Sequence, residues 1–445
     1  MLDAISLKIY EMRRYLVLSL VISMIAIPFA DLLVIERDRN RNEMYGEGFW
    51  IYGFSIYNMN DNELAEKMGP PFNDGLHTLP GYLGNITYEY PVFGLIFFAI
   101  GTWLFPGAGG FQPLWLNFVL TLVFNLNLVL VAVLLGDKIY NRKWARLFFA
   151  GYYVYGLIMA AGGGKLEPIV DCLMLMALLL RKEDQMGKSM FTLGLSVQTK
   201  IYSGVLLPLL FIEAPMSVIW FFISTLLTVV PFIFLGANFD SLLQHFLNTS
   251  SYSSYIVNPL YPGLFLETPG FGEFQPSYMW PPALIPLIVY VVFMFSTVRI
   301  YLPSFEEMKK ATWQARLNKL KPLYLYILPS FLFVFRWVMP WYLFWLGPLC
   351  VMFNDDKQAI GYLKQITIIG LLYTFGIFIN WPYFVNRPLI DFSEHFPFGW
   401  LTFIGLSLLF ALVGVAYVIW KKEVDRRRNR DKIIKKAEAR GELVL

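Results

Sequence analysis

Long apolar runs alternate with short polar segments along almost the whole chain. A helix needs about 20 apolar residues to cross a bilayer, and several runs reach or approach that length. The runs that read as straight crossings are 15–34, 113–135, 147–161, 166–180, 218–235, 284–301, 324–335, 341–353, 366–379 and 401–420. Together with two irregular segments they predict an all-α polytopic membrane protein with about 12 transmembrane crossings.

Two apolar segments do not fit straight crossings. The run 91–105 is shorter than a span, and we expect a re-entrant or interfacial helix on the outer face. The segment 190–211 carries Lys200 near its middle and Pro208 beyond it. Two half-crossings that meet near Lys200 and Tyr202 keep the later basic loops on one face. Broken helices of this kind are tolerated where they line a cavity.

Lys and Arg gather in every second polar segment. These basic segments are the residues Lys8, Arg13 and Arg14 and the ranges 138–146, 181–182, 309–321 and 421–436. Basic loops stay in the cytoplasm, so both termini are predicted to be cytoplasmic. The opposite loops hold Trp, Tyr, Pro and acidic residues. We therefore expect a multi-pass plasma-membrane protein with an extracytoplasmic active site.

The same pattern divides the chain into three parts. We expect a membrane module at 1–235, which contains a long first extracytoplasmic loop at 36–112. A second, variable module covers 236–420, and a basic cytoplasmic tail covers 421–445. The outer loops of the second module are 236–280 and 380–397.

Composition agrees with a membrane protein and excludes several classes. The chain is 57% hydrophobic and 15% charged, whereas soluble proteins carry about 25% charged residues. The net charge of +4 comes largely from cytoplasmic Lys and Arg and indicates no nucleic-acid partner. The two cysteines, Cys172 and Cys350, lie inside apolar runs. No metal-ligand spacing or phosphate-binding glycine loop occurs, so we expect neither a metal nor a cofactor.

Ionisable residues inside or beside apolar runs are the first candidates for chemistry. Lys200 is the sharpest, as a cation for a phosphate group, with a lysine that snorkels to the interface as the alternative. Arg336 has the same two interpretations. Glu167 and Asp171 are one helical turn apart and either bind substrate or pair with Lys165. The other outer-face candidates are Glu47 and Asp38 as acids, and Glu89, Tyr90 and His245 as substrate-binding residues.

Four segments, in this order, resemble the GT-C superfamily of polytopic glycosyltransferases. Thr87–Pro91 is similar to the aromatic-Pro opening of the superfamily's interfacial segment. Gly164–Glu167 resembles the Gly-x-x-Glu helix of the polyprenyl-phosphate-mannose-dependent transferases, which include the catalytic subunit of GPI mannosyltransferase I and bacterial and archaeal relatives. Lys200–Tyr202 is similar to that family's Lys-Ile-Tyr segment, and Trp341–Leu349 resembles its late aromatic span.

The resemblance implies a GT-C fold and an inverting, metal-independent transfer from a polyprenyl-phosphate sugar to a glycan or glycolipid acceptor. It places the general base on Glu47, where the family usually has Asp, often paired; Asp38 is the other candidate. Lys200, Tyr202 and Arg336 are then expected to hold the phosphate and lipid of the donor. The sugar is a hexose with mannose favoured, and an accessory membrane subunit is left open as a partner.

Two other functions remain open. A lipid-linked glycan flippase or other transporter would hold a lipid phosphate with the same cations and aromatic rings, and a glycan ligase would transfer whole chains. The long outer loops and short basic inner loops favour chemistry on one face. Asn85 and Asn248 begin N-glycosylation sequons on that outer face.

Overall fold

The computed structural model describes residues 2–26, 36–70, 72–73, 87–88, 90–104, 113–157, 165–235, 292, 299, 303–310, 312–330 and 340–379. Within these ranges almost all of the backbone is helical and no strand forms; the isolated antiparallel bridge of this part joins Asn60 and Thr87. The predicted all-α class is confirmed for the described chain. The expected loops 236–280 and 380–397, the run 401–420, the tail 421–445 and both sequon asparagines lie outside it.

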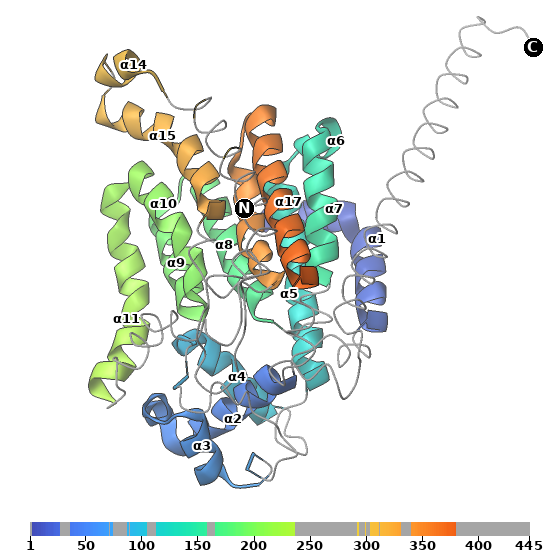
Figure 1. Ribbon diagram of the computed structural model, residues 1–445, viewed down its shortest axis with the longest axis vertical. Helices are drawn as coiled ribbons and strands as arrows, with labels where there is room; N and C mark the ends of the chain where they lie inside the picture. The colour runs from blue at the N-terminus through green and yellow to red at the C-terminus, as the bar shows by residue number, and fades with distance from the viewer. Residues whose placement is uncertain are drawn as a thin grey trace, which may run out of the picture.

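A bundle of helices forms the body of the molecule (Figure 1). Helix α8 packs between α5 and α9, α9 packs on α11, and α1 packs on α5. The helices of this bundle are α1 (Leu2–Ala26), α5 (Pro113–Leu135), α7 (Lys143–Leu157), α8 (Glu167–Lys182), α9 (Met186–Thr199), α10 (Leu207–Glu213), α11 (Val218–Phe234), α15 (Trp313–Ile327) and α17 (Asp356–Ile379).

Glycines let two pairs of bundle helices approach closely. A Cβ added to Gly194 of α9 would lie 1.6 Å from the Ser224 hydroxyl of α11. One added to Gly156 of α7 would lie 1.8 Å from the Phe124 ring of α5. Side chains at these positions would force the helices apart, since packed interiors leave no such space.

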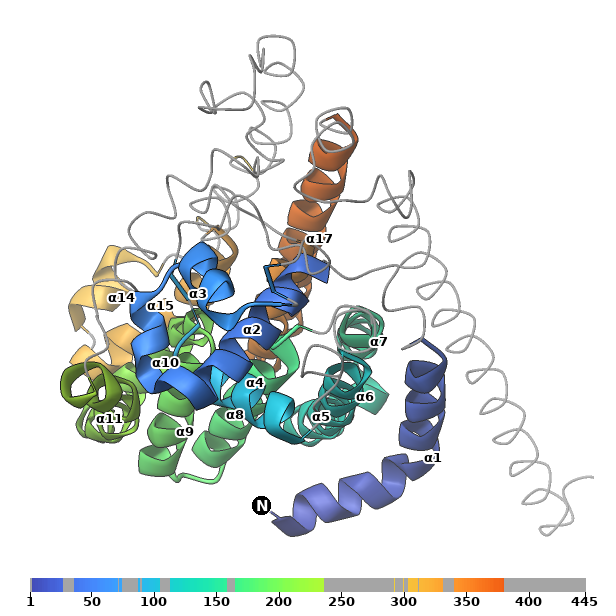
Figure 2. The same cartoon turned by 90° about the horizontal axis from the view of Figure 1, so that it is seen from below.

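Three helices and a 3₁₀ turn cover one end of the bundle, which we call the α3 end. They are α2 (Glu36–Tyr52), η2 (Gly53–Asn58), α3 (Asp61–Met68) and α4 (Val92–Leu104). Figure 2 looks at this end and shows α2 and α4 crossing over α8 and α9. The short helix expected at 91–105 is thus confirmed as α4. The first half of the outer loop expected from residue 36 is mostly helical over 36–68.

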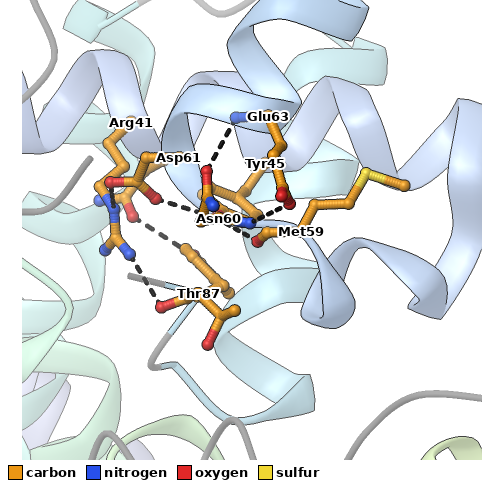
Figure 3. Close-up of polar contacts among 9 residues, drawn as sticks. Arg41, Tyr45, Met59, Asn60, Asp61, Glu63 and Thr87 are labelled. Carbon is orange, nitrogen blue, oxygen red and sulfur yellow. Dashed lines mark hydrogen bonds and ion pairs between the residues drawn. The ribbon is translucent and has the colours of Figure 1, made fainter. Parts of the chain in front are cut away.

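A buried polar cluster ties the α3 end together (Figure 3). Arg41 Nε donates to Asp61 Oδ2 at 2.7 Å, and the two side chains are only 2% and 0% exposed. The Tyr45 hydroxyl donates to the other oxygen of Asp61 at 2.9 Å. Arg41 also reaches the backbone oxygen of Thr87 at 3.2 Å. Asn60 starts α3 with a capping box that includes the Glu63 side chain. These contacts link α2, α3 and the segment that leads to α4.

Basic residues gather at the opposite end, the α6 end, around α6 (Lys138–Asn141), α14 (Phe305–Lys310) and the start of α15 (Figure 1). Arg142 pairs with Asp356 at 2.9 Å, which joins α6 to the start of α17. Glu213, at the end of α10, pairs with both Arg181 of α8 and Lys321 of α15. The described basic segments at 138–146, 181–182 and 309–321 therefore lie towards one end of the fold.

Helix ends match the hydropathy pattern unevenly. Helix α5 begins at Pro113 and ends at Leu135, as expected. Helix α15 begins at Trp313 rather than at the expected residue 324, because the Thr312 side chain caps it by accepting from the Ala315 amide. Helix α17 likewise begins at Asp356 rather than at residue 366.

Length and composition mark one helix of the described residues, Leu116–Leu135, as able to cross a membrane. Shorter apolar helices occur at Val92–Leu104, Ile201–Glu213 and Pro215–Leu227. The number of about 12 crossings stays a prediction.

Candidate functional site

The helix break predicted at Lys200 is confirmed. Helix α9 ends at Thr199, and Lys200 is extended, with φ −158° and ψ 131°. The chain then forms the 3₁₀ helix η4 (Ile201–Leu206) and α10. Glu213 at the end of α10 pairs with Arg181, so the chain returns to the end at which α9 began. The two halves therefore form a hairpin whose apex carries Lys200.

The Lys200 ammonium is held by a buried carboxylate. Its Nζ lies 2.6 Å from Glu167 Oε1, and the side chains are 17% and 0% exposed. The Trp345 indole N–H donates to the same oxygen at 3.1 Å. The other oxygen, Oε2, is buried and accepts no hydrogen bond. A buried acceptor left unsatisfied costs about 1–3 kcal/mol.

Three stacked aromatic rings flank this ion pair. Trp345, in η8 (Pro340–Met352), stacks on Tyr342 with ring centroids 3.7 Å apart and on Tyr202 at 4.5 Å. The Lys200 Nζ lies 5.5 Å from the Trp345 centroid and 5.6 Å from that of Tyr90. Aromatic faces attract a cation at these distances, so the rings fix the ammonium without neutralising it.

One helical turn further along α8, Asp171 is fully buried and held by two tyrosines. The Tyr152 hydroxyl donates to Oδ2 and the Tyr202 hydroxyl to Oδ1, both at 3.0 Å. Since Lys200 and Tyr202 both bond to α8, the apex of the hairpin is attached to that helix at two points.

The α3 end contacts the apex through Tyr90 and α4. The Tyr57 hydroxyl donates to the backbone oxygen of Tyr90 at 2.8 Å. A Cβ on Gly94 would lie 3.2 Å from the backbone oxygen of Thr199, so α4 packs directly on the last turn of α9. Lys200 thus lies where the bundle meets the covering helices.

Glu47 lies on α2 and is half-buried. Burial away from water raises the pKa of its carboxyl group to about 7. No hydrogen bond or ion pair among the described residues joins Glu47 to the Lys200 site. Asp38 is also in α2, nine residues earlier in the sequence.

The structure brings together five of the predicted residues: Lys200, Tyr202, Tyr90, Glu167 and Asp171. Arg336, His245 and Glu89 lie outside the described residues. Sequence reasoning gave no site role to Tyr152, Tyr342 or Trp345, although Tyr342 and Trp345 lie in the aromatic span 341–349 that carries part of the resemblance. The described residues contain no group of three or more potential metal ligands.

Comparisons with protein-family models, with curated proteins and with solved structures found no match to this chain.

Proposed function

We propose that the chain is an integral membrane glycosyltransferase. It moves a hexose, with mannose favoured, from a polyprenyl-phosphate donor to a glycan or glycolipid acceptor at the extracytoplasmic face of the plasma membrane. The observation that carries the proposal is the Lys200–Glu167 pair at the apex of a helical hairpin, flanked by Tyr90, Tyr202 and Trp345.

Exposed apolar side chains support a lipid environment. Helix α11 exposes Ile219, Trp220, Phe222, Ile223, Leu226, Leu227, Val230 and Phe234, and α1 exposes Val17, Leu18, Val21, Met24 and Ile25. Patches of this extent are unusual on soluble monomers and mark contact with lipid or protein. The basic α6 end supports a cytoplasmic position for that end, by the positive-inside rule.

The proposed reaction is a single displacement at the anomeric carbon. Glu47 takes the proton of the acceptor hydroxyl, whose oxygen bonds to the anomeric carbon as the bond to the phosphate oxygen breaks. Lys200 holds the departing phosphate, since its ammonium has three donors and Glu167 occupies one of them. A cation fixed in a partly dry site stabilises developing charge more strongly than one in water. The pKa of Glu47, near 7, suits a general base at neutral pH.

The test is transfer from a synthetic polyprenyl-phosphate mannose by the purified protein in lipid nanodiscs with EDTA present. We expect release of polyprenyl phosphate together with mannosylated acceptor. Glu47→Gln should lower kcat by about 100-fold or more, as removal of a general base does, while donor binding is retained. Glu66→Gln, on the exposed face of α3, is the matched control and should keep full activity.

Two results would change the proposal. Full activity in Glu47→Gln would move the base to Asp38. Absence of turnover with every lipid-linked hexose, despite donor binding, would reject the transferase.

A lipid-linked glycan flippase is the second candidate, and the hairpin with Lys200 at its apex favours it, since broken helices line substrate sites in transporters. Proteoliposomes loaded with a fluorescent polyprenyl-phosphate sugar separate the two. A flippase moves the intact lipid across the bilayer, whereas the transferase changes it chemically on one side.

A further inference from the structure

Glu167 carries a carboxylate oxygen, Oε2, that accepts no hydrogen bond from the residues that the structure describes. Its side chain is 0% exposed, and Oε1 receives both the Lys200 ammonium and the Trp345 indole. The carboxylate is asymmetric in its contacts: Oε1 accepts two hydrogen bonds, and Oε2 accepts none among the described residues.

The usual structural roles of an acid at this position do not account for Oε2. Glu167 is the first residue of α8, yet its Oε2 accepts no hydrogen bond from the backbone amides of that first turn. The described residues offer no companion ligands for a metal ion. Asp171, the next acid on the same face, has both of its oxygens engaged by tyrosines, so of these two described acids Glu167 is the one with an unpaired oxygen.

The position of Oε2 relative to Lys200 limits the donor that can reach it. Oε1 and Oε2 belong to one carboxylate, and Oε1 is 2.6 Å from the ammonium. A ligand whose phosphate lies on Lys200 must therefore present its donor very close to that phosphate. In a hexosyl phosphate, the hydroxyl nearest to the phosphate is on the carbon next to the anomeric carbon.

We infer that Glu167 Oε2 accepts a hydrogen bond from the 2-hydroxyl of the donor hexose while Lys200 holds the adjacent phosphate. The inference rests on the proposed glycosyltransferase and adds a specificity determinant to it. The site accordingly selects sugars with a free 2-hydroxyl, because a 2-deoxy sugar leaves the buried oxygen unsatisfied.

The experiment compares donors that lack one hydroxyl each, using the wild-type protein in nanodiscs. We expect kcat/KM for the 2-deoxyhexosyl donor to fall by about 10- to 100-fold, the range for a hydrogen bond to a charged group. The 3-, 4- and 6-deoxy donors should stay within about threefold of the parent. Electronic effects do not explain such a loss, since removal of the 2-hydroxyl makes the anomeric carbon more reactive.

Two variants separate binding at Oε2 from a general structural role. In Glu167→Gln the preference for the parent over the 2-deoxy donor should shrink to about threefold. Asp171→Asn is the matched control, and whatever its absolute rate, its preference should remain that of the wild type. If Glu167→Gln does not fold, the donor series with wild type alone decides the question.

Equal use of the 2-deoxy and parent donors would overturn the inference while leaving the transferase in place. So would a loss confined to the 3-, 4- or 6-deoxy donor. Failure of every donor to react would instead reject the proposed function, so the two failures are distinguishable.

Discussion

At the scale of single residues, Glu47 sets the predicted pH dependence of the reaction. A general base works as the carboxylate, and burial raises the pKa of this carboxyl group to about 7. Below pH 7 the group is protonated in the free enzyme, so kcat/KM should fall about tenfold per pH unit and level off above pH 8. Initial rates from pH 5 to 9 measure this.

The variant Glu47→Gln provides the control for that profile. Its residual activity should show no break near pH 7, because an amide does not titrate. A wild-type profile that is flat between pH 5 and 8 would contradict the assignment of Glu47 as the base.

The Arg41–Asp61 pair predicts a large effect on stability. Asp61→Asn leaves the guanidinium buried without its counter-charge, and breaking a buried pair costs about 3–5 kcal/mol. Glu307→Gln, which removes the exposed partner of Lys319, should cost less than about 1 kcal/mol. The measurement is the thermal unfolding midpoint of each variant in detergent, with size-exclusion chromatography as the readout of folded protein. Equal midpoints for the two variants would mean that the buried pair does not stabilise the α3 end.

Residue chemistry predicts part of the site but not its partners. Lys200, Glu167 and Asp171 stand out because charged groups in apolar runs are costly. Trp345 does not stand out, because it reaches Glu167 across 178 positions of sequence and aromatic residues abound in the chain. Arg41 and Asp61 look like ordinary loop charges until the turn after α2 folds back and buries them.

At the scale of helices, the pattern predicts apolar centres better than helix ends. The break at Lys200 follows from a charge at the middle of an apolar run, and it is confirmed. Helices α15 and α17 begin about ten residues before the apolar runs at 324 and 366. Hydropathy does not predict these starts, because it indicates which residues face an apolar environment and not where a helix begins. Backbone hydrogen bonding begins where a cap such as Thr312 satisfies the first amides.

The close contact between α9 and α11 predicts that alanine destabilises at Gly194, whereas alanine at Gly151, a glycine with open space around it, should stabilise. Gly194→Ala should lower the melting midpoint strongly, since its methyl group would lie 1.6 Å from the Ser224 hydroxyl oxygen. Gly151→Ala is the control: it lies in α7 with nothing within 4 Å of the added carbon. It should stabilise by about 0.5–1 kcal/mol, because alanine favours the helix. The reverse order of midpoints would contradict the close packing of α9 on α11.

At the scale of the whole molecule, the two ends predict opposite labelling in cells. Asn62→Cys on α3 and Lys143→Cys at the start of α7 are both exposed and lie towards opposite ends of the bundle. In the proposed orientation, an impermeant maleimide labels Asn62→Cys on intact cells and Lys143→Cys only after permeabilisation. The wild-type protein controls for reaction at Cys172 and Cys350. Labelling of both variants on intact cells would contradict the orientation.

At this scale the sequence predicts which segments are basic, but it does not predict the tertiary contacts that join distant segments. Arg142, in one of the basic segments, pairs with Asp356 at the α6 end, while the cytoplasmic position of that end stays a prediction. The sequence predicts a long first outer loop at 36–112 but not the bounds of α2, η2 and α3 within it. The buried Arg41–Asp61 pair and the packing of α2 on α4 hold these elements in place. Residue spacing along the chain does not reveal these contacts.

The two partners of Glu213 also impose an order of events during biosynthesis. Arg181 emerges before Glu213, whereas Lys321 follows it by 108 positions. At ordinary translation speeds of about 5–20 residues per second, that separation corresponds to roughly 5–20 s. During this interval Glu213 has only the first of these two partners, while Lys200 and Tyr202 at the apex of the hairpin can already bond to α8. A chain that ends within the intervening segment therefore carries Glu213 with Arg181 as a partner but without Lys321.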